Sequence, residues 1–310
     1  MREIRVPAFA KINLRLDILG KRTDGYHELR TIFQTISLHD ELRFGLSDGS
    51  GIALNILGND ALSRKGAREN LVYRAVARLR NELKIRSGVR IELHKRIPVG
   101  AGLGGGSSDA AAALRGYLRF TRKRLEPARL LEIASSLGAD VPFFLLGGRA
   151  LGVNRGDEIY PLADIRTLAV LVVVPRGVQV ATPDAFRWLK AATLASAPRL
   201  TKTGGTPKLW EFCALCWSTQ GSGLSNDFER PVFRRHPRLA IIKRALLRAG
   251  AAEASLAGSG SAVFGVFPSP TLARRAAVGF STDQTFVCET ISRDKYLRLV
   301  NNAPHVVRAV

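Results

Sequence analysis

Hydrophobic and polar residues alternate along the N-terminal part of the chain. The alternating apolar positions of the clearest run are Ile12, Leu14, Leu16 and Ile18. This period of two predicts a strand with one buried and one polar face, and it places Lys11 and Asn13 on the same polar side. Residues 1–6 are charged and also alternate, which predicts a first strand and argues against a signal peptide.

A second alternating run, formed by Val89, Ile91, Leu93 and Ile97, leads into a glycine-dense segment and then into an alanine-rich run. Residues 98–110 read PVGAGLGGGSSDA, so a strand, a glycine loop and a helix are expected in that order. Ser107, Ser108 and Asp109 are expected to cap the N-terminus of this helix. A further helix is expected from Pro127, suited to a first turn, to Gly138, suited to the C-terminal cap.

The glycine loop predicts a phosphate-binding site. Glycines adopt positive φ readily, so their backbone N–H groups can converge on an anion beside the positive end of the helix dipole. A nucleoside-triphosphatase loop requires a lysine followed by Ser or Thr directly after its last glycine, and here Gly106 is followed by Ser107. The spacing of Gly100, Gly102 and Gly105 does satisfy the dinucleotide fingerprint. However, no second strand ending in an acidic residue follows, so a Rossmann oxidoreductase is a minor alternative.

Composition narrows the class of protein. The chain has 310 residues, of which 46% are hydrophobic, and its longest purely apolar run, residues 168–174, has strand length and is too short to span a membrane. We therefore expect a protein of the cytoplasm with no membrane partner. Three cysteines argue against a disulfide framework, and the pair Cys213 and Cys216 lacks the second pair of a typical zinc site.

The net charge of +21 raises nucleic-acid binding as a competing hypothesis. The 47 basic residues are spread along the whole chain in short groups, without an aromatic platform or a basic tail. A solvated, strongly positive surface is the favoured interpretation, and specific nucleic-acid binding is not expected.

Several separate segments together resemble the GHMP kinase superfamily of small-molecule kinases. The matching pieces, in family order over nearly the full length, are residues 10–14, residues 25–29 with Phe33 and Gln34, residues 98–108, residues 138–144, residues 226–229 and residues 254–261. The glycine loop marks the superfamily. The Lys-Ile-Asn strand and the Gly-Tyr-His segment are most similar to members that phosphorylate a cytidine diphosphate-linked polyol in the non-mevalonate route to isoprenoid precursors. A kinase of the homoserine or mevalonate type is the alternative within the superfamily.

This resemblance implies an α+β fold with two domains. The N-terminal domain, residues 1–155, would be of the ribosomal protein S5 type, and the C-terminal domain, residues 156–310, would be ferredoxin-like, with the active site in the cleft between them. Residues 190–222 match no clear pattern and are expected to form a loop or an inserted helical excursion.

The resemblance also implies roles for individual residues. Asp140 would be the catalytic base and Lys11 its partner, in an ATP-dependent transfer of phosphate to a hydroxyl group. In the acceptor pocket Tyr26 and Phe186 would stack on the two faces of a cytosine ring and His27 would hydrogen-bond its edge, while Thr182 and Pro183 would line the adjoining wall. Asn13 would contact the polyol or its phosphate.

The glycine loop would bind ATP, the co-substrate. The residues assigned to ATP are Pro98, Val99, Gly100, Ala101, Gly102, Leu103, Gly104, Gly105, Gly106, Ser107 and Ser108. Magnesium is expected with the nucleotide because the triphosphate charge must be neutralised during transfer. The hydroxyl of Ser108 is one candidate ligand, but the sequence assigns no metal ligand. The second glycine loop, with Gly258 and Gly260, would face the active site from the C-terminal domain.

Overall fold

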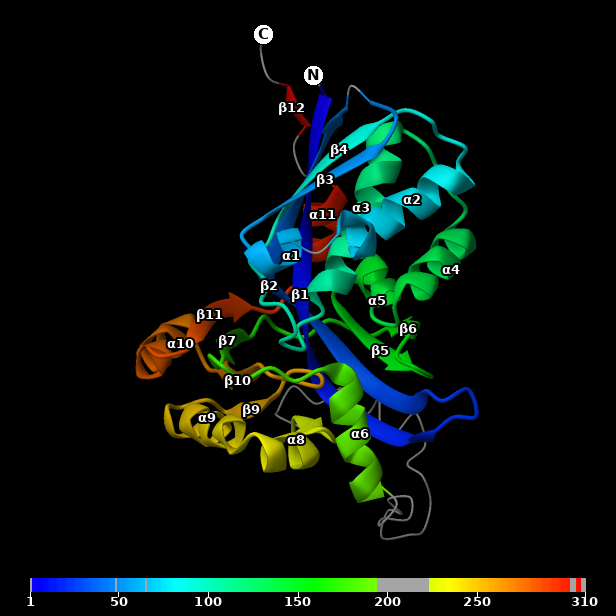
Figure 1. Cartoon of the computed structure of the whole chain (residues 1–310). Helices are drawn as coiled ribbons and strands as arrows, with labels where there is room; N and C mark the ends of the chain where they lie inside the picture. The colour runs from blue at the N-terminus through cyan, green and yellow to red at the C-terminus, as the bar shows by residue number, and fades with distance from the viewer. Residues whose placement is uncertain (1, 48, 65, 194–222, 302–304, 308–310) are drawn as a thin grey trace.

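The structure is a computed structural model that describes residues 2–47, 49–64, 66–193, 223–301 and 305–307. It contains two antiparallel or mixed sheets with helices packed against them, which confirms the expected α+β class (Figure 1). Among the described residues, no helix is both long and apolar enough to cross a membrane. The N-terminal strand and the last strand of the chain pair with each other, so both ends of the chain lie on the same side of the molecule.

The first sheet is built around two long strands. The strands are β1 (Arg2–Lys21), β2 (His27–Leu46), β3 (Ile52–Leu57), β4 (Val89–His94), β5 (Arg149–Val153), β6 (Glu158–Pro161), β8 (Ser225–Asn226) and β12 (His305–Val307). The order β12-β1-β2-β4-β3 forms its main path, while β5 pairs with β2 and β6, and β8 pairs with β1. The two strand predictions are confirmed over residues 2–6 and 12–18, since both runs belong to β1, and Met1 lies outside the described residues. The sheet is not a doubly wound parallel sheet, which removes the Rossmann alternative.

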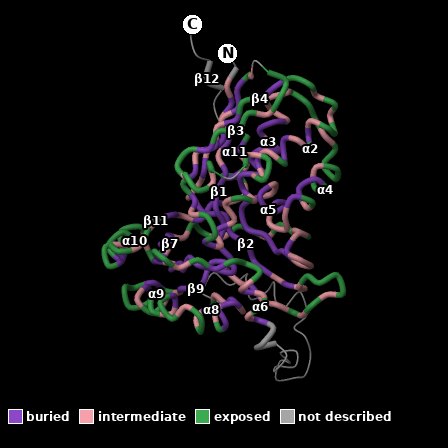
Figure 2. Tube along the Cα trace, in the orientation of Figure 1, coloured by how far each residue is buried: buried purple, intermediate pink, exposed green. Residues whose placement is uncertain are grey.

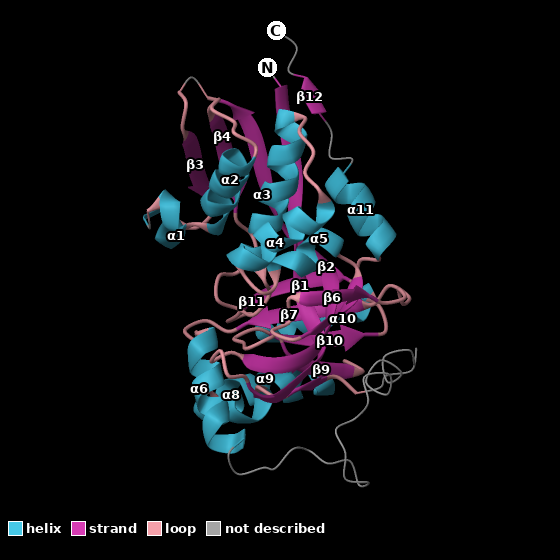
Figure 3. Cartoon of the chain, turned by 90° about the vertical axis from the view of Figure 1, so that its right-hand side faces the viewer, coloured by secondary structure: helices cyan, strands magenta, loops and turns pink. Residues whose placement is uncertain are grey.

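Helices cover one face of this first sheet, as the side view shows (Figure 3). The helical segments of this part are α1 (Asp60–Arg64), η1 (Ala67–Glu69), α2 (Leu71–Glu82), α3 (Gly105–Thr121), α4 (Pro127–Leu137) and α5 (Val141–Leu146). The alanine run of α3 is fully buried in the core between sheet and helices, because alanine lets α3 approach β1 and β2 closely. The predicted α4 boundaries at Pro127 and Gly138 are confirmed.

The second sheet has the order β11-β7-β10-β9, from β7 (Ala169–Val174), β9 (Glu253–Leu256), β10 (Val263–Phe267) and β11 (Gln284–Glu289). Numbered along the chain this order is 4-1-3-2, the ferredoxin-like arrangement that the resemblance implied. The helical segments of this part are α6 (Thr182–Thr193), α8 (Glu229–Arg235), α9 (Pro237–Arg248), α10 (Pro270–Ala277) and η2 (Val278–Phe280). Of the segment 190–222, residues 190–193 end α6 and the remainder, with Cys213 and Cys216, lies outside the described residues.

Strand β7 explains the apolar run seen in the sequence. Leu171 and Val173 pack with the helices of the second sheet, whereas Val170 and Val172 join a core shared with β1, β2 and the glycine loop. Both faces of β7 are therefore buried, and a strand buried on both faces requires a continuous apolar sequence. Buried residues accordingly run from one sheet into the other (Figure 2). The shared core fixes the two sheets relative to each other and sets the position of the site between them.

The last helix, α11 (Arg293–Asn301), returns to the first sheet. Tyr296 and Val300 of this helix pack against Phe9 of β1. The C-terminal part of the chain therefore contributes to both sheets. The division into domains at about residue 155 stays a prediction.

Candidate active site

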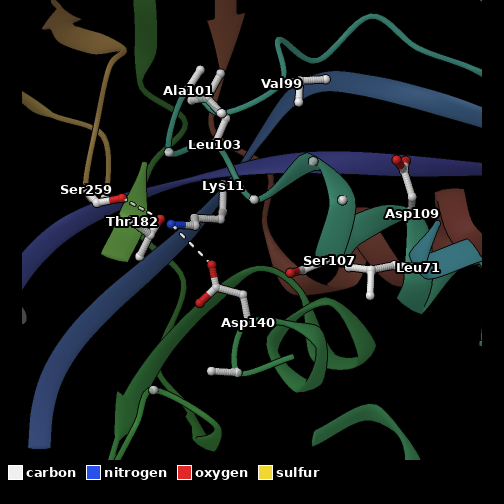
Figure 4. Close-up of a pocket in the computed structure, with 18 of the residues that line it drawn as sticks. Lys11, Leu71, Val99, Ala101, Leu103, Ser107, Asp109, Asp140, Thr182 and Ser259 are labelled. Carbon is white, nitrogen blue, oxygen red and sulfur yellow. Dashed lines mark hydrogen bonds and ion pairs between the residues drawn. The ribbon is translucent and has the colours of Figure 1, made fainter. Parts of the chain in front are cut away.

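A pocket of about 610 Å³ lies between the glycine loop, strands β1 and β2, the start of α5, helix α6 and the loop between β9 and β10 (Figure 4). The residues predicted from the sequence that line it are Lys11, Asn13, residues 98–107, Asp140, Thr182 and Phe186. Four predicted residues do not line it, namely Tyr26, His27, Ser108 and Pro183. The pocket thus brings together residues that lie far apart in the sequence, from Lys11 of β1 to Ser259 in the loop between β9 and β10.

The glycine loop owes its shape to alternating left-handed glycines. Gly100, Gly102 and Gly104 have φ values of 70°, 79° and 71°. A Cβ atom on Gly102 would lie 1.9 Å from the carbonyl oxygen of Ala257, and one on Gly104 would lie 2.8 Å from the Phe144 ring. Only glycine fits at these two positions, because both the backbone conformation and the close approach exclude a side chain.

The helix after the loop begins earlier than the sequence indicated. Gly104 is the N-cap of α3, so Ser107, Ser108 and Asp109 lie inside its first turns, and the prediction that they cap the helix was wrong. The left-handed Gly104 lets the helix start directly from the loop. The N–H group of Ser108 donates to the Gly104 carbonyl at 2.9 Å, whereas the preceding N–H groups of the first turn have no partner inside the helix. These first-turn groups and the helix dipole favour an anion at this end of α3.

Lys11 and Asp140 form an ion pair on the pocket wall, with 3.5 Å between Nζ and Oδ2. Lys11 is almost fully buried, with 5% of its side chain exposed, whereas 33% of the Asp140 side chain is exposed. Asp140 is the N-cap residue of α5, where Pro142 stiffens the first turn and fixes the direction of the carboxylate. Lys11 also donates to Asn13 Oδ1 at 2.8 Å, and this confirms that the two side chains share one face of β1.

A chain of hydrogen bonds behind this ion pair fixes the lysine. Asn13 Nδ2 donates to the Thr31 hydroxyl at 2.7 Å, and that hydroxyl donates to the carbonyl of Arg15 at 2.8 Å. The backbone N–H of Lys11 donates to the Leu103 carbonyl of the glycine loop at 3.0 Å. Strand β1 therefore holds both the lysine and the loop in register.

The aromatic residues predicted for the acceptor pocket contact other side chains in the structure. The rings of His27 and Phe186 stack on each other, with 4.6 Å between centroids and 22° between planes. Tyr26 is 57% exposed, and the guanidinium carbon of Arg155 lies 4.9 Å from its ring centroid. In the structure, Phe186 thus stacks on His27, and Tyr26 lies against Arg155 outside the pocket lining.

A buried charge cluster under the glycine loop was missed in the sequence. Lys95 Nζ donates to Asp109 Oδ2 at 2.8 Å and is also hydrogen-bonded to Asp40, whose other oxygen accepts from the Ile97 N–H at 2.8 Å. Burial, reinforced by the charge of Asp40, raises the pKa of Asp109 to about 8 against the opposing effect of Lys95. Burial alone would lower the pKa of Lys95, but the two carboxyl groups outweigh it and raise that pKa.

The alternation of apolar and polar residues in two strands does indicate this cluster. Asp40 and Lys95 occupy inward positions of two otherwise apolar runs, and the pairing of Glu41 with His94 in the sheet places them opposite each other. Opposite charges at inward positions of neighbouring strands predict a buried ion pair once the register is known.

The second glycine loop contacts the first one. The Ala262 N–H donates to the Ala101 carbonyl at 3.1 Å, and both Gly258 and Ser259 line the pocket. Ser259 is hydrogen-bonded to Thr182 at 2.9 Å (Figure 4). The side chain of Asn226 donates to the carbonyls of Leu256 and Gly258 at 2.9 and 2.7 Å, so residues 226–229 support this loop.

The wall nearest the N-terminal end of α3 was also missed. Leu62, Gly66, Asn70 and Leu71 line the pocket on this side. No pattern of residue types distinguishes these positions from other helix and turn residues, so sequence reasoning had no means to find them. The described residues contain no cluster of three or more His, Cys, Asp or Glu side chains that could hold a metal ion.

Comparison with known proteins agrees with this geometry. The model of the GHMP kinases N terminal domain matches residues 70–148, and the model of the GHMP kinases C terminal domain matches residues 209–282. A 4-diphosphocytidyl-2-C-methyl-D-erythritol kinase from Solibacter usitatus is 42% identical over 303 residues, which are 97% of this chain and 93% of the relative.

Solved structures agree as well. The crystal structure of a 4-(cytidine 5'-diphospho)-2C-methyl-D-erythritol kinase superposes with a TM-score of 0.76 at 34% identity, covering 93% of this chain and 99% of that one. A homoserine kinase from Cytophaga hutchinsonii shares the fold, with a TM-score of 0.64 at 24% identity over 94% of this chain and 95% of the other. The chain therefore belongs to the GHMP kinases and, within them, to the 4-diphosphocytidyl-2-C-methyl-D-erythritol kinase family.

Proposed function

We propose that this protein transfers the γ-phosphate of ATP to the 2-hydroxyl of 4-diphosphocytidyl-2-C-methyl-D-erythritol, which yields the 2-phosphate and ADP. The observation that carries the proposal is the Lys11–Asp140 ion pair, which lies in the same pocket as the glycine loop. A carboxylate and an ammonium group beside a phosphate-binding loop suit phosphoryl transfer to an alcohol. Family membership suggests the acceptor, since a relative with this name matches 97% of the chain.

Asp140 would act as the base. Its half-exposed carboxylate can accept the proton of the acceptor hydroxyl while that oxygen forms a bond to the γ-phosphorus and the bond to the leaving oxygen of ADP breaks. Lys11 would hold the Asp140 carboxylate in place through the ion pair and would offset the negative charge that gathers on the transferred phosphoryl group. Because Lys11 is held by Asn13 and by the strand, little reorganisation would accompany the reaction.

The glycine loop would bind the phosphates of ATP through residues 98–107. Its left-handed glycines direct backbone groups toward the pocket, and the first turn of α3 offers N–H groups and the helix dipole. Ser108 would contribute through packing, since its side chain is buried and its N–H group is used within the helix. The wall formed by Leu62, Gly66, Asn70 and Leu71 would accommodate the nucleoside, because it adjoins the loop.

The acceptor would bind on the side of Thr182 and Phe186. Tyr26 and Phe186 would enclose the cytosine ring, and His27 would hydrogen-bond its edge. Since His27 covers one face of Phe186 in the structure, the acceptor would displace the imidazole from that face on binding. Pro183 would shape the adjoining wall, and Asn13 would face the polyol.

Magnesium would enter with the nucleotide. Ser108, the magnesium ligand considered from the sequence, does not line the pocket, so its hydroxyl is not placed to bind the ion. We expect the ion to be held by phosphate oxygens and water, as magnesium commonly is when it accompanies a nucleotide. Addition of a chelator in excess should abolish turnover, and added magnesium should restore it.

One assay tests the proposal. ADP release is followed with ATP, magnesium and the cytidine-linked acceptor, with homoserine and mevalonate as alternative acceptors. Asp140→Asn should lower kcat by about 100-fold or more, the range expected for a lost general base, while ATP binding is retained. Asp294→Asn, an exposed aspartate of α11 outside the pocket, is the matched control and should leave kcat unchanged. Full activity of Asp140→Asn would refute the base assignment, and turnover with only another acceptor would refute the proposed substrate.

A further inference from the structure

The turn between β5 and β6 clasps the tip of the β1–β2 hairpin. The N–H group of Leu29 donates to the Asn154 carbonyl at 2.8 Å, which joins the two segments through the backbone. Arg22 adds side-chain bonds to Asn154 and, at 3.0 Å, to Glu28. The hairpin tip, which carries the Gly-Tyr-His segment, is therefore positioned by a turn more than 120 residues later in the sequence.

Arg155 is the residue of this turn that contacts Tyr26. Its guanidinium carbon lies 4.9 Å from the ring centroid, within the range of a cation–π interaction. The guanidinium is held on its other side by Asp157, which accepts from Nε at 3.1 Å and from a second nitrogen and whose side chain is only 9% exposed. The hydrogen bond to Asp157 raises the pKa of Arg155, so the cation persists at all working pH values.

The placement of these groups separates their roles. Arg155 and the adjoining Gly156 line the pocket, whereas Tyr26 does not. Asp157 already pairs with Arg155 and holds its guanidinium over the Tyr26 ring. The Tyr26 ring is more than half exposed at the hairpin tip, so it can rotate unless a neighbour fixes its plane. If the ring were not fixed beforehand, its loss of rotational freedom would weaken ligand binding.

We propose that Arg155 is a positioning residue for acceptor recognition: held by Asp157, it fixes the ring of Tyr26 so that this ring can receive a pyrimidine. This inference rests on the proposed function, because it assigns Tyr26 to the acceptor. It adds that recognition depends on a residue of the β5–β6 turn that acts through Tyr26. A direct ion pair between Arg155 and the diphosphate of the acceptor is the competing arrangement.

A double-mutant cycle distinguishes the two arrangements. Arg155→Gln, Tyr26→Leu and the double variant are compared in KM for the acceptor, KM for ATP and kcat. Arg155→Gln should raise KM for the acceptor by about 3- to 10-fold, as loss of one cation–π contact predicts, while KM for ATP and kcat change less than 2-fold. In the Tyr26→Leu background the same substitution should have no further effect. In a Tyr26→Phe background, which keeps the ring, the full effect should remain.

Controls keep the outcome specific. Arg129→Gln removes an arginine that forms a comparable double contact with Glu82 on α2 and α4, away from the pocket, and should change neither KM. If Arg155→Gln does not fold, Arg155→Lys, which keeps a charge for Asp157 but lacks the flat face, replaces it in the same cycle. Equal effects of the Arg155 variant in the wild-type and Tyr26→Leu backgrounds, or no effect in either, would overturn the inference. Absence of turnover by the wild type with this acceptor would instead refute the proposed function.

Discussion

The buried charge cluster of Lys95, Asp40 and Asp109 leads to a sharp prediction about stability. If all three groups were ionised, two carboxylates and one ammonium would leave one uncompensated negative charge in the core. Because the pKa of Asp109 is raised to about 8, this carboxyl group is mostly protonated at neutral pH. Asparagine is close in shape to a protonated aspartate, so Asp109→Asn should change the stability of the fold little, whereas Lys95→Met should lower it strongly.

The magnitudes follow from what each substitution leaves behind. Asp109→Asn preserves the pair of Lys95 with Asp40, so near pH 4 it should lower the free energy of unfolding by less than about 1 kcal/mol, the scale of one neutral hydrogen bond. At pH 7 the variant should be at least as stable as the wild type, because only the wild type must keep a carboxyl group protonated in the folded state. Lys95→Met leaves Asp40 buried without a cation, and breaking a buried pair in this way typically costs about 3–5 kcal/mol. Given a total stability of about 5–15 kcal/mol, the second loss is severe.

The dependence on pH gives an independent test. A raised carboxyl pKa means that the folded state keeps the proton of Asp109 while the unfolded chain has lost it, between about pH 4 and pH 8. The folded state binds more protons in this window, so the contribution of Asp109 to stability falls as pH rises, by at most about 1.4 kcal/mol per pH unit, and becomes constant above pH 8. Asp109→Asn has no such group and should show a flatter profile.

Unfolding by urea, followed by circular dichroism at five pH values from 5 to 9, measures all of these quantities. The free energy of unfolding should depend on pH in the same way for the wild type and Asp294→Asn. The difference in this free energy between the wild type and Asp109→Asn should change steadily from pH 5 to pH 8. A loss in Asp109→Asn at pH 7 as large as that in Lys95→Met would contradict the reasoning. An unchanged slope with pH in Asp109→Asn would do so as well.

Two further predictions concern the loops and the buried thiol. Gly102→Ala should raise KM for ATP at least 10-fold, because the new Cβ would clash with the Ala257 carbonyl and the left-handed backbone would add strain of about 1 kcal/mol. Gly100→Ala carries the same strain but has open space around it, so it should change KM for ATP by only a few-fold. Equal effects of the two substitutions would contradict the steric argument. Burial raises the pKa of the Cys288 thiol to about 11, so mass spectrometry should find Cys288 unmodified by iodoacetamide at pH 7.5 in the folded protein and modified in urea. Rapid modification in the folded protein would show that the thiol is accessible.

The sequence predicted the elements that depend on local pattern. The period of two in β1 is strong enough to place Lys11 and Asn13 on one face, and the structure joins them at 2.8 Å. The start of α3 was misplaced because Ser107 and Asp109 are good capping residues, whereas the left-handed Gly104 takes that position as a consequence of loop geometry. Local preference and tertiary packing compete at such a helix boundary. Here the close approach of Gly104 to Phe144 and Lys11 leaves room only for glycine at the N-cap position.

Contacts between distant segments could not be derived from the sequence. The stacking of His27 on Phe186 and the contact of Arg155 with Tyr26 depend on how the hairpin tip, α6 and the β5–β6 turn converge. Each of these two contacts joins different elements, so periodicity carries no information about them. By contrast, the pair of Asp40 and Lys95 could have been found from the alternation, had the register of β2 and β4 been available.

The two glycine loops show why both sheets are needed for one site. Gly102 of the first loop approaches the Ala257 carbonyl of the second, and Ala262 donates back to Ala101. Gly258 in turn lies against Lys11, since a Cβ at that position would be 3.2 Å from Nζ. Asn226 holds the second loop from behind with two hydrogen bonds, and the N–H of Ile18 on β1 donates to the neighbouring Asp227. Strand β1 therefore carries Lys11 and, seven residues beyond it, Ile18, which anchors the segment that supports the second loop. A shift of the second sheet would therefore move the surroundings of Lys11 directly.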